Sequence, residues 1–480
     1  MYQFSTPLFD QLLLHTKKKP ISLHVPGHKD GHLLSINLDA RYKIFKELLT
    51  IDATELIGLD DLHSPSGPIL ESERLLAEAY GAKKSYFLVN GSTVGNLAMI
   101  LSMVKENDDV LVQRNCHKSI LNGISLAKGR PIFLSPEYDE DWLVSNDVSY
   151  ETLKKGIELY PNAKTLILTY PNYYGMTYDL GKLIRLAHDH NITVLVDEAH
   201  GAHFIGSKHF PQSAIELGAD LVVQSAHKTL PAMTMGAYLH INNQRVSNVE
   251  VEYYLTILQS SSPSYLIMAS LDIARSYVST YSELDFAYLT GKIKEFKKQI
   301  ECIKGIRVLT YRKGLCDPLK MTIQTTSELT GFEIQARLEK SGIYTELADP
   351  YNVLFVLPLL KNKMDYPFDR IVKAMKQALI DVEDKGIQKH TFVYQQKVAA
   401  IEVNETERKK LKKKLVPLDS AMNQICADVV IPYPPGIPIL FPGEKITTFH
   451  IEYIKLLLTS GAKFQGTPFL KDGTINVYVT

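Results

Sequence analysis

Two apolar segments of the chain are followed by polar side chains that could hold a charged ring. Asp197 comes directly after Thr193–Val196, and Lys228 lies 31 positions later, after the next apolar segment. A carboxylate at a strand end can hold a protonated ring nitrogen, and a partly buried lysine can act as an amine nucleophile. A single lysine in a turn indicates only a surface position. Ser225 and His227 flank Lys228 with donors that a phosphate group needs, and this favours a binding role.

Two further segments carry groups that would complete such a site. Residues 90–96 (NGSTVGN) follow the apolar segment Ser85–Val89 and offer flexible glycines with the hydroxyls of Ser92 and Thr93. This composition suits an anion at the start of a helix, although a simple capping turn would look the same. His117 begins another predicted helix and could lie flat over an aromatic ring or merely cap that helix. The four groups together are those needed to hold pyridoxal phosphate.

Other chemistry is conceivable for residues 197–200, whose sequence is DEAH. The same letters mark a nucleotide-hydrolysing motif, but that motif requires a phosphate loop ending in Gly-Lys-Ser or Gly-Lys-Thr. The nearest candidate, residues 175–182, ends in Gly-Lys and is followed by Leu183. His200 and His203 could bind a metal, yet two histidines without clustered further ligands are weak evidence. We therefore predict no metal site.

The composition excludes several classes of protein. The 480 residues are 45% hydrophobic and 22% charged, which is typical of a globular chain and not of a disordered one. Lysine plus arginine and aspartate plus glutamate both number 53, so no overall charge attracts nucleic acid or an anionic membrane. A small molecule is the expected partner.

The cysteines and the hydropathy indicate a cytoplasmic protein. Four cysteines lie far apart and form no CxxC pair, which fits a reducing compartment. No apolar run reaches the roughly 18 residues of a membrane span. The basic cluster Lys17–Lys19 follows the first apolar stretch, the reverse of the order in a secretory signal.

The elements that must position these residues alternate between short apolar strands and helices. Such alternation predicts an α/β fold with a mainly parallel sheet, whose ligands lie at the carboxyl ends of the strands. The expected strands are residues 85–89, 109–112, 131–134, 165–169, 193–196 and 221–223, and the expected helices are 93–104, 118–127 and 182–190.

The pattern changes after about residue 265. One long helical stretch, Leu266–Ile303, precedes a smaller α+β unit with strands expected at 307–310, 321–325 and 353–356 and a helix at 331–341. The charged run Glu405–Lys414 predicts a helix with a solvated face. Ile431–Gly443 contains five prolines, which exclude a helix and favour a stiff, extended path.

At this point the chain resembles the ornithine/lysine/arginine decarboxylase family of pyridoxal-phosphate enzymes, which have the aspartate-aminotransferase fold (fold type I). It is most similar to the short bacterial biosynthetic type, often assigned to arginine. The resemblance implies an N-terminal segment (1–70), a cofactor-binding large domain (71–285), a small α+β domain (286–395) and a C-terminal domain (396–480). The motifs that carry it are HVPGHKDG (24–31), GLDDLHSPSGPI (58–69), NGSTVGN, RNCHKS, DEAHGAH, QSAHKTLPAMTMGA (224–237) and YPPGIPILFPGE (433–444).

The resemblance also implies roles for individual residues. Lys228 is expected to form the aldimine with the cofactor, Asp197 to hold its ring nitrogen and His117 to stack on the ring. Lys228 or His227 is expected to return a proton to the substrate. The expected phosphate ligands are Ser92, Thr93, Ser225 and His227.

Two positions depart from the family pattern. Ser261 replaces a threonine whose hydroxyl, in relatives, reaches the phosphate of the neighbouring subunit, so a homodimer or higher homo-oligomer with shared sites is expected. His200 stands where some relatives have tryptophan beside the ring.

The expected activity is the decarboxylation of a basic amino acid, with arginine giving agmatine and CO₂ for polyamine biosynthesis as the favoured case and lysine or ornithine as alternatives. An aminotransferase on the same fold is less favoured, and intact Lys228, Asp197 and His117 argue against a catalytically silent relative. Candidate carboxylates for the distal cation of the substrate are Asp60, Asp61, Glu346 and Glu444, each of which could equally be a solvated or capping acid.

Overall fold

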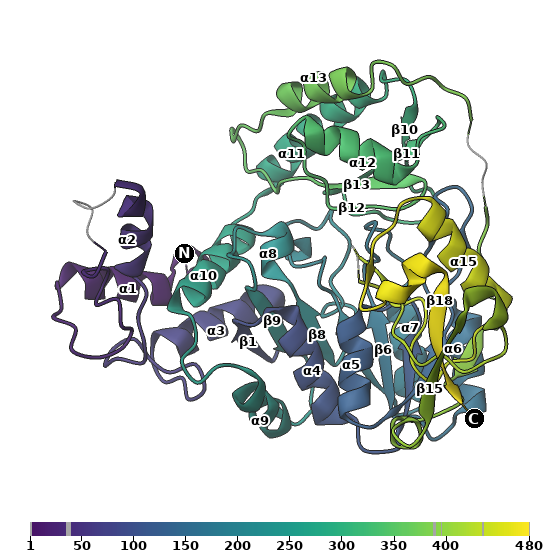
Figure 1. Ribbon diagram of the computed structural model, residues 1–480. Helices are drawn as coiled ribbons and strands as arrows, with labels where there is room; N and C mark the ends of the chain where they lie inside the picture. Colours follow the sequence, from purple (N-terminus) through teal and green to yellow (C-terminus); the bar gives the residue numbers. More distant parts are fainter. Residues whose placement is uncertain (1, 35–39, 387–389, 395, 434–435, 480) are drawn as a thin grey trace. The chain divides into compact units, whose positions relative to one another are not determined.

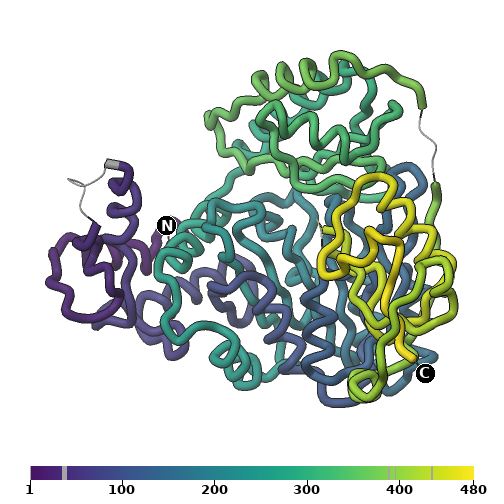
Figure 2. Tube along the Cα trace, viewed as in Figure 1, coloured from purple at the N-terminus to yellow at the C-terminus, as the bar shows by residue number. Residues whose placement is uncertain are grey.

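The computed structural model describes residues 2–34, 40–386, 390–394, 396–433 and 436–479. Two prolines of the proline-rich segment, Pro434 and Pro435, lie outside these ranges. The chain divides into two compact units: the first unit comprises residues 1–103 and 195–282, and the second unit comprises residues 104–194 and 283–480. In Figure 2 the first unit is the purple-to-blue beginning of the tube together with its teal middle part.

The strands of the first unit lie in the order β1-β9-β8-β7. β7 and β8 run parallel, with Asp197 opposite Val223, whereas β9 is antiparallel to both β8 and β1. The chain leaves the first unit after Met103 and returns to it within β7, after Val194. β9 was not expected from the sequence, because His240 interrupts its apolar run. The bounds are β1 Lys84–Leu88, β7 Thr193–Asp197, β8 Leu221–Gln224 and β9 Ala237–Ile241.

Helices of the first unit bring together segments that are far apart in the sequence. α1, α3 and α10 contact one another (Figure 1), so the start of the chain lies beside residues 265–279. α4 packs closely on the sheet at Gly95, where a Cβ atom would lie 2.6 Å from Leu88 Cδ1 and 2.9 Å from Val223 Cγ1. The bounds are α1 Pro7–Lys17, α2 Lys43–Leu49, α3 Pro68–Tyr80, α4 Gly91–Met103, α8 Ala226–Thr229, α9 Asn248–Leu258 and α10 Tyr265–Ser279.

The strands of the second unit that belong to its larger sheet lie in the order β6-β2-β3-β14. β2 is parallel to both β6 and β3, and β14 adds an antiparallel edge. The expected α/β class with mainly parallel strands is therefore confirmed. The bounds are β2 Asp109–Gln113, β3 Arg130–Leu134, β6 Thr165–Thr169, β14 Val398–Ala400, α5 Lys118–Leu126, α6 Tyr150–Leu159 and α7 Leu180–Asp189.

A smaller antiparallel sheet of the second unit has the order β10-β11-β13-β12, and its strands β10, β11 and β13 and the helix α12 were expected from the sequence, whereas β12 and α13 were not. The single helix expected over Leu266–Ile303 is wrong, because the chain leaves the helix after Ser279. There the hydroxyl and the backbone N–H of Thr280 both donate to the carbonyl of Ser276 (2.6 and 3.2 Å), and the N–H of Tyr281 donates to Val278 in a tighter turn. The bounds are α11 Glu283–Ile300, β10 Ile306–Val308, β11 Lys320–Thr325, α12 Gly331–Lys340, β12 Leu347–Ala348, β13 Asn352–Val356 and α13 Phe368–Ala378.

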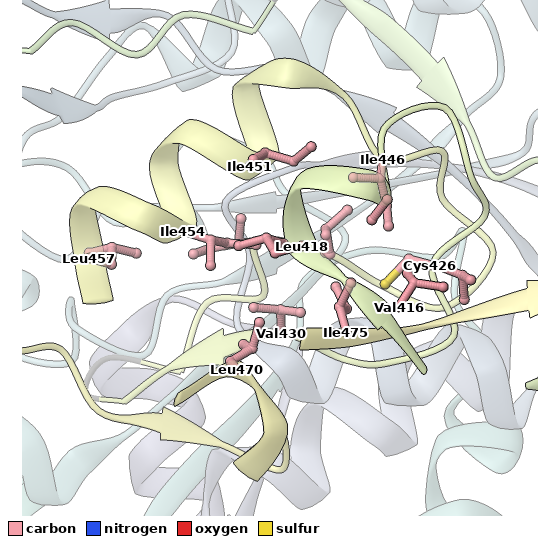
Figure 3. Packing of buried hydrophobic residues seen from close by; sticks show 14 residues of the cluster. Val416, Leu418, Cys426, Val430, Ile446, Ile451, Ile454, Leu457, Leu470 and Ile475 are labelled. Atoms are coloured by element: carbon pink, nitrogen blue, oxygen red, sulfur yellow. The ribbon is translucent and has the colours of Figure 1, made fainter. Parts of the chain in front are cut away.

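The C-terminal part of the second unit has an apolar core of its own, to which the residues labelled in Figure 3 belong. The helix expected over Glu405–Lys414 is wrong: α14 ends at Arg408, and Lys412–Lys414 lie in β15, which pairs antiparallel with β18. Exposed lysines suit an edge strand as well as a helix, so their pattern could not distinguish the two. The described part of Ile431–Gly443 contains no helix, as expected. The bounds are α14 Glu405–Arg408, β15 Lys412–Pro417, β16 Ile431–Pro432, α15 Thr448–Thr459, β17 Phe464–Gln465 and β18 Thr474–Val479, and the second unit also has a short hairpin of β4 Tyr138–Asp139 and β5 Val144–Ser145.

Candidate cofactor site

Asp197 is the last residue of β7 and is almost fully buried. Asn96 of α4 donates its Nδ2 hydrogen to Oδ2 of this carboxylate over 3.0 Å, and the backbone N–H of Ala199 donates to Oδ1 over 3.1 Å. One donor on each oxygen fixes the plane of the carboxylate. Such a group can orient a cationic N–H of a ligand in one direction.

Lys228 follows β8 in the short helix α8 and is half-buried. Its Nζ lies 3.2 Å from Nε2 of His200, which is itself buried. A lysine ammonium can only donate, so Nε2 of His200 accepts and the ring carries its proton on Nδ1. The structure therefore brings together two of the predicted site residues, and the imidazole holds the amine in place.

The hydroxyls expected to bind phosphate also meet. Ser225 Oγ donates to Ser92 Oγ over 2.8 Å, and Thr93 follows on the exposed side of the first turn of α4. Gly91 begins this helix with φ +79°, a conformation that favours glycine, and its N–H donates to the carbonyl of Met235. Hydroxyls at the start of a 13-residue helix are a suitable cradle for a phosphate group.

His227 lies between Ser225 and Lys228 in the sequence. Its Nδ1 lies 2.9 Å from the carbonyl oxygen of Gly236, and its backbone N–H donates to the same oxygen over 3.1 Å. Because a carbonyl only accepts, Nδ1 of His227 carries a proton and donates it to Gly236. The turn between α8 and β9 thereby fixes the orientation of the ring.

These first-unit residues fit pyridoxal phosphate by their chemistry. They comprise an oriented carboxylate, a half-buried primary amine, and a pair of serine hydroxyls at a helix start. Within the ranges that the structure describes, no three His, Cys, Asp or Glu side chains gather as metal ligands would. The helices in those ranges include none with the length and apolarity of a membrane span.

His117 belongs to the second unit and caps α5. Its Nδ1 accepts the backbone N–H of Ser119 over 3.2 Å, which confirms the capping interpretation. A Cβ atom on Gly436 would lie 3.3 Å from His117 Nε2, so a residue of the proline-rich segment passes close to the ring. The capping bond fixes the ring orientation, and the predicted stacking role stays a prediction.

The four candidate carboxylates differ in what they contact. Asp60 accepts backbone N–H groups from the turn that precedes α3, including those of Ser66 (2.8 Å) and Gly67 (2.7 Å). Burial raises the pKa of Asp60, but these backbone bonds outweigh it and leave the pKa lowered. Its neighbour Asp61 is half-buried and accepts the N–H of His63 (2.8 Å). Asp60 thus has the contacts of a turn-forming residue.

The other two candidates lie in the second unit. Glu444 is buried and pairs with Arg114, whose guanidinium Nη2 lies 2.8 Å from Glu444 Oε2 and also donates to the carbonyl of Ile439. Burial raises the pKa of Glu444 against the opposing effect of Arg114. Glu346 is exposed and lies next to β12. The contacts leave Asp61 and Glu346 as the better candidates for contact with a ligand.

Sequence reasoning missed residues that hold the site residues or their neighbours by hydrogen bonds. Asn96 was part of a quoted motif, and its spacing of four from Ser92 places both on one helix face, so periodicity could have found it. Glu198, in the DEAH sequence, is fully buried and accepts a hydrogen bond from the amide of Gln224. Ser261 lies exposed between α9 and α10.

The buried pair in the second unit gives a first test. The substitution Glu444→Ala leaves the Arg114 guanidinium buried without its partner, and loss of one member of a buried pair lowers the free energy of unfolding by about 3–5 kcal/mol. Urea denaturation of wild type and variant measures this difference. The exposed Glu452→Ala, also in the C-terminal part, should change stability by less than about 0.5 kcal/mol. A stable Glu444→Ala variant with weakened substrate binding would instead return Glu444 to the substrate site.

Comparison with known proteins identifies the family. Residues 6–314 match the model for the Orn/Lys/Arg decarboxylase major domain, and residues 385–473 match the model for its C-terminal domain. An uncharacterized protein of Bacillus subtilis, YaaO, is 43% identical over 99% of both chains. An arginine decarboxylase of the same organism is 33% identical over 99% of this chain and 98% of that one. The lysine decarboxylase LdcA of Pseudomonas aeruginosa is 25% identical over 96% of this chain and 77% of that one.

Solved structures agree with the expected fold. The constitutive lysine decarboxylase of E. coli superimposes with a TM-score of 0.80 at 17% identity, over 99% of this chain and 82% of that one. A serine palmitoyltransferase of Sphingomonas wittichii superimposes with a TM-score of 0.51 at 18% identity, over 65% of this chain and 75% of that one. The fold of pyridoxal-phosphate enzymes of type I, expected from the sequence, is thereby confirmed.

Proposed function

Because the chain belongs to the Orn/Lys/Arg decarboxylase family, we propose that it removes the α-carboxyl group of L-arginine, with pyridoxal phosphate bound, to give agmatine and CO₂. The observation that supports a working catalyst is the arrangement at the ends of β7 and β8. There Asp197 is oriented by Asn96, and the amine of Lys228 is held by His200. These polar groups are buried or half-buried and already oriented, as a cofactor site requires.

Pyridoxal phosphate, when bound, supplies an electron-accepting ring for the electron pair that CO₂ leaves behind. Asp197 would keep a proton on the ring nitrogen, because its carboxylate is oriented by two donors and can accept a further N–H. Ser92, Thr93 and Ser225 would hold the phosphate. The amine of Lys228 would anchor the cofactor, and either this amine or His227 would return a proton to Cα of the substrate.

The choice of arginine is supported by the relatives. The short arginine decarboxylases match the chain from end to end, whereas the lysine decarboxylase LdcA is longer and less similar. Lysine and ornithine are the alternatives, because chain length in a pocket changes binding by only about 1–3 kcal/mol per methylene. An aminotransferase on this fold would produce a keto acid rather than CO₂.

The proposed assembly is a homodimer or higher homo-oligomer in the cytoplasm. Several large apolar side chains of the first unit are exposed, and contact with a second subunit would bury such side chains. The exposed hydroxyl of Ser261 would reach the phosphate of a neighbouring subunit. Exposed apolar residues near the N-terminus include Ile21 (90%), Leu23 (93%) and Ile57 (105%).

The central assignment is tested by removing the amine. The substitution Lys228→Ala should abolish the visible absorbance of the covalently held cofactor and CO₂ release from arginine, lysine and ornithine, assayed in parallel. Wild type should release CO₂ fastest from arginine, and the exposed Lys83→Ala should behave like wild type. An unchanged spectrum in Lys228→Ala would exclude this lysine, and keto acid in place of CO₂ would exclude a decarboxylase.

The distal carboxylate is tested by the substitution Glu346→Gln. Loss of a charge-assisted hydrogen bond of about 1.5–3 kcal/mol should raise KM for arginine roughly tenfold or more, with a smaller effect on kcat. Glu339→Gln, an exposed glutamate of α12, is the matched control and should leave KM unchanged. If Glu346→Gln also leaves KM unchanged, Asp61→Asn becomes the variant that must show the effect.

The assembly is tested by sedimentation velocity on the active holoenzyme. We expect a dimer or larger species. Ser261→Ala should weaken cofactor binding and leave this assembly intact. Activity in a monomeric fraction would contradict shared sites.

A further inference from the structure

We propose that Glu198 is a positioning residue that holds the ends of β7 and β8 in the register that cofactor binding needs. This inference rests on the proposed function, in which Asp197, Ser225 and Lys228 surround the cofactor. Glu198 follows Asp197 directly and is fully buried, so it acts through its neighbours and not by contact with the substrate.

The carboxyl group of Glu198 is the acceptor for three donors. Oε2 accepts the Nε2 hydrogen of Gln224 (2.6 Å) and the hydroxyl of Ser213 (2.8 Å), and Oε1 accepts the backbone N–H of Ala214 (2.7 Å). Burial raises the pKa of Glu198 to about 8, although these three bonds lower it. A buried carboxyl group is costly, and the three bonds are what offset this cost.

The bond to Gln224 continues into a longer chain. Gln224 Oε1 lies 3.2 Å from Nε2 of His240, and Nδ1 of His240 lies 2.7 Å from the hydroxyl of Ser85. Burial lowers the pKa of His240 to about 3, so the ring is neutral. With Nε2 as the donor to Gln224, the hydroxyl of Ser85 donates to Nδ1 and every link has one donor and one acceptor.

The series of side-chain contacts leads back to the loop that contains Glu198. The ring of His240 stacks on that of Tyr80 with centroids 4.7 Å apart, and the Tyr80 hydroxyl donates to the carbonyl of Ala202 over 2.6 Å. Residues 198–202 are therefore held at both ends by one connected set of side chains. The loop also passes close over Glu198, since a Cβ atom on Gly201 would lie 2.6 Å from Glu198 Cγ.

This network acts on the positions that matter for the site. Gln224 immediately precedes Ser225, and Glu198 immediately follows Asp197, so their hydrogen bond sets the offset between the two strand ends. Two backbone bonds extend the same pairing: Glu198 N–H to the carbonyl of Val223 (2.9 Å) and Ser225 N–H to the carbonyl of Ala199 (3.3 Å). Loss of the Glu198–Gln224 bond should move the carboxylate and the phosphate cradle relative to each other.

The test exchanges the two partners. Glu198→Gln replaces one of the two accepting oxygens of Glu198 by an amide nitrogen, and Gln224→Glu removes the amide hydrogen that Glu198 accepts, whereas the double exchange restores one donor and one acceptor at this contact. Each variant is prepared as full-length apoprotein and titrated with pyridoxal phosphate. The pH dependence of the visible absorbance is then recorded on the loaded protein. Thermal unfolding of the apoprotein measures stability separately.

We expect each single variant to raise the Kd for pyridoxal phosphate at least tenfold and to shift the pH dependence of absorbance. The exchange should return the Kd to within about threefold of wild type, and exposed Glu250→Gln, the matched control on α9, should leave it unchanged. If Gln224→Glu does not fold, the Kd values of Glu198→Gln, the double exchange and wild type are sufficient to test the proposal. Single variants that lose thermal stability but bind the cofactor within twofold of wild type would overturn the proposal. Failure of wild type to bind pyridoxal phosphate would overturn the proposed function instead.

Discussion

The parallel pairing of β7 with β8 is the interaction on which the candidate site depends. Both strands are apolar and buried, and their polar residues begin where the strands end. Because the strands run parallel in register, with Asp197 opposite Val223, the two sets of polar residues emerge at the same edge of the sheet. An antiparallel arrangement would have placed them at opposite ends. The pairing therefore places Asp197 and Lys228, which are 31 positions apart in the sequence, at the same edge of the sheet.

Buried polar groups at this edge are satisfied by neutral donors. Asp197 is held by an amide and a backbone N–H, and Glu198 by an amide, a hydroxyl and a backbone N–H. Glu444, in the second unit, has a guanidinium partner instead. Neutral donors orient the carboxylate of Asp197 without adding an opposite charge, so this group can still pair with a cationic ligand, whereas Glu198 is fully buried and serves as an acceptor for its neighbours. An ion pair uses up the charge of its carboxylate, which is why Glu444 is better explained as part of the core.

The same distinction shows how far candidate residues can be predicted. The order of motifs in the sequence located the amine, the carboxylate and the hydroxyls, because strand ends can be recognised from short apolar runs. The four candidate acids could not be ranked in that way. The salt bridge of Glu444 depends on a partner 330 residues away, and the turn-forming role of Asp60 depends on a backbone conformation that brings N–H groups of residues 66 and 67 to one carboxylate.

By itself, the sequence determined the α/β class, most strands and helices, and the residue types present at each strand end, because these follow from local periodicity and short apolar runs. Only the tertiary structure decided that β9 joins the sheet, that residues 266–303 form two helices, and that Lys412–Lys414 belong to a strand. It also decided that Asn96 holds the carboxylate of Asp197, that His200 holds the amine of Lys228, and that Glu198 bonds to Gln224 beside them. Hydrogen bonds between distant segments leave no periodic trace, since each requires only one suitable side chain brought within reach by the fold.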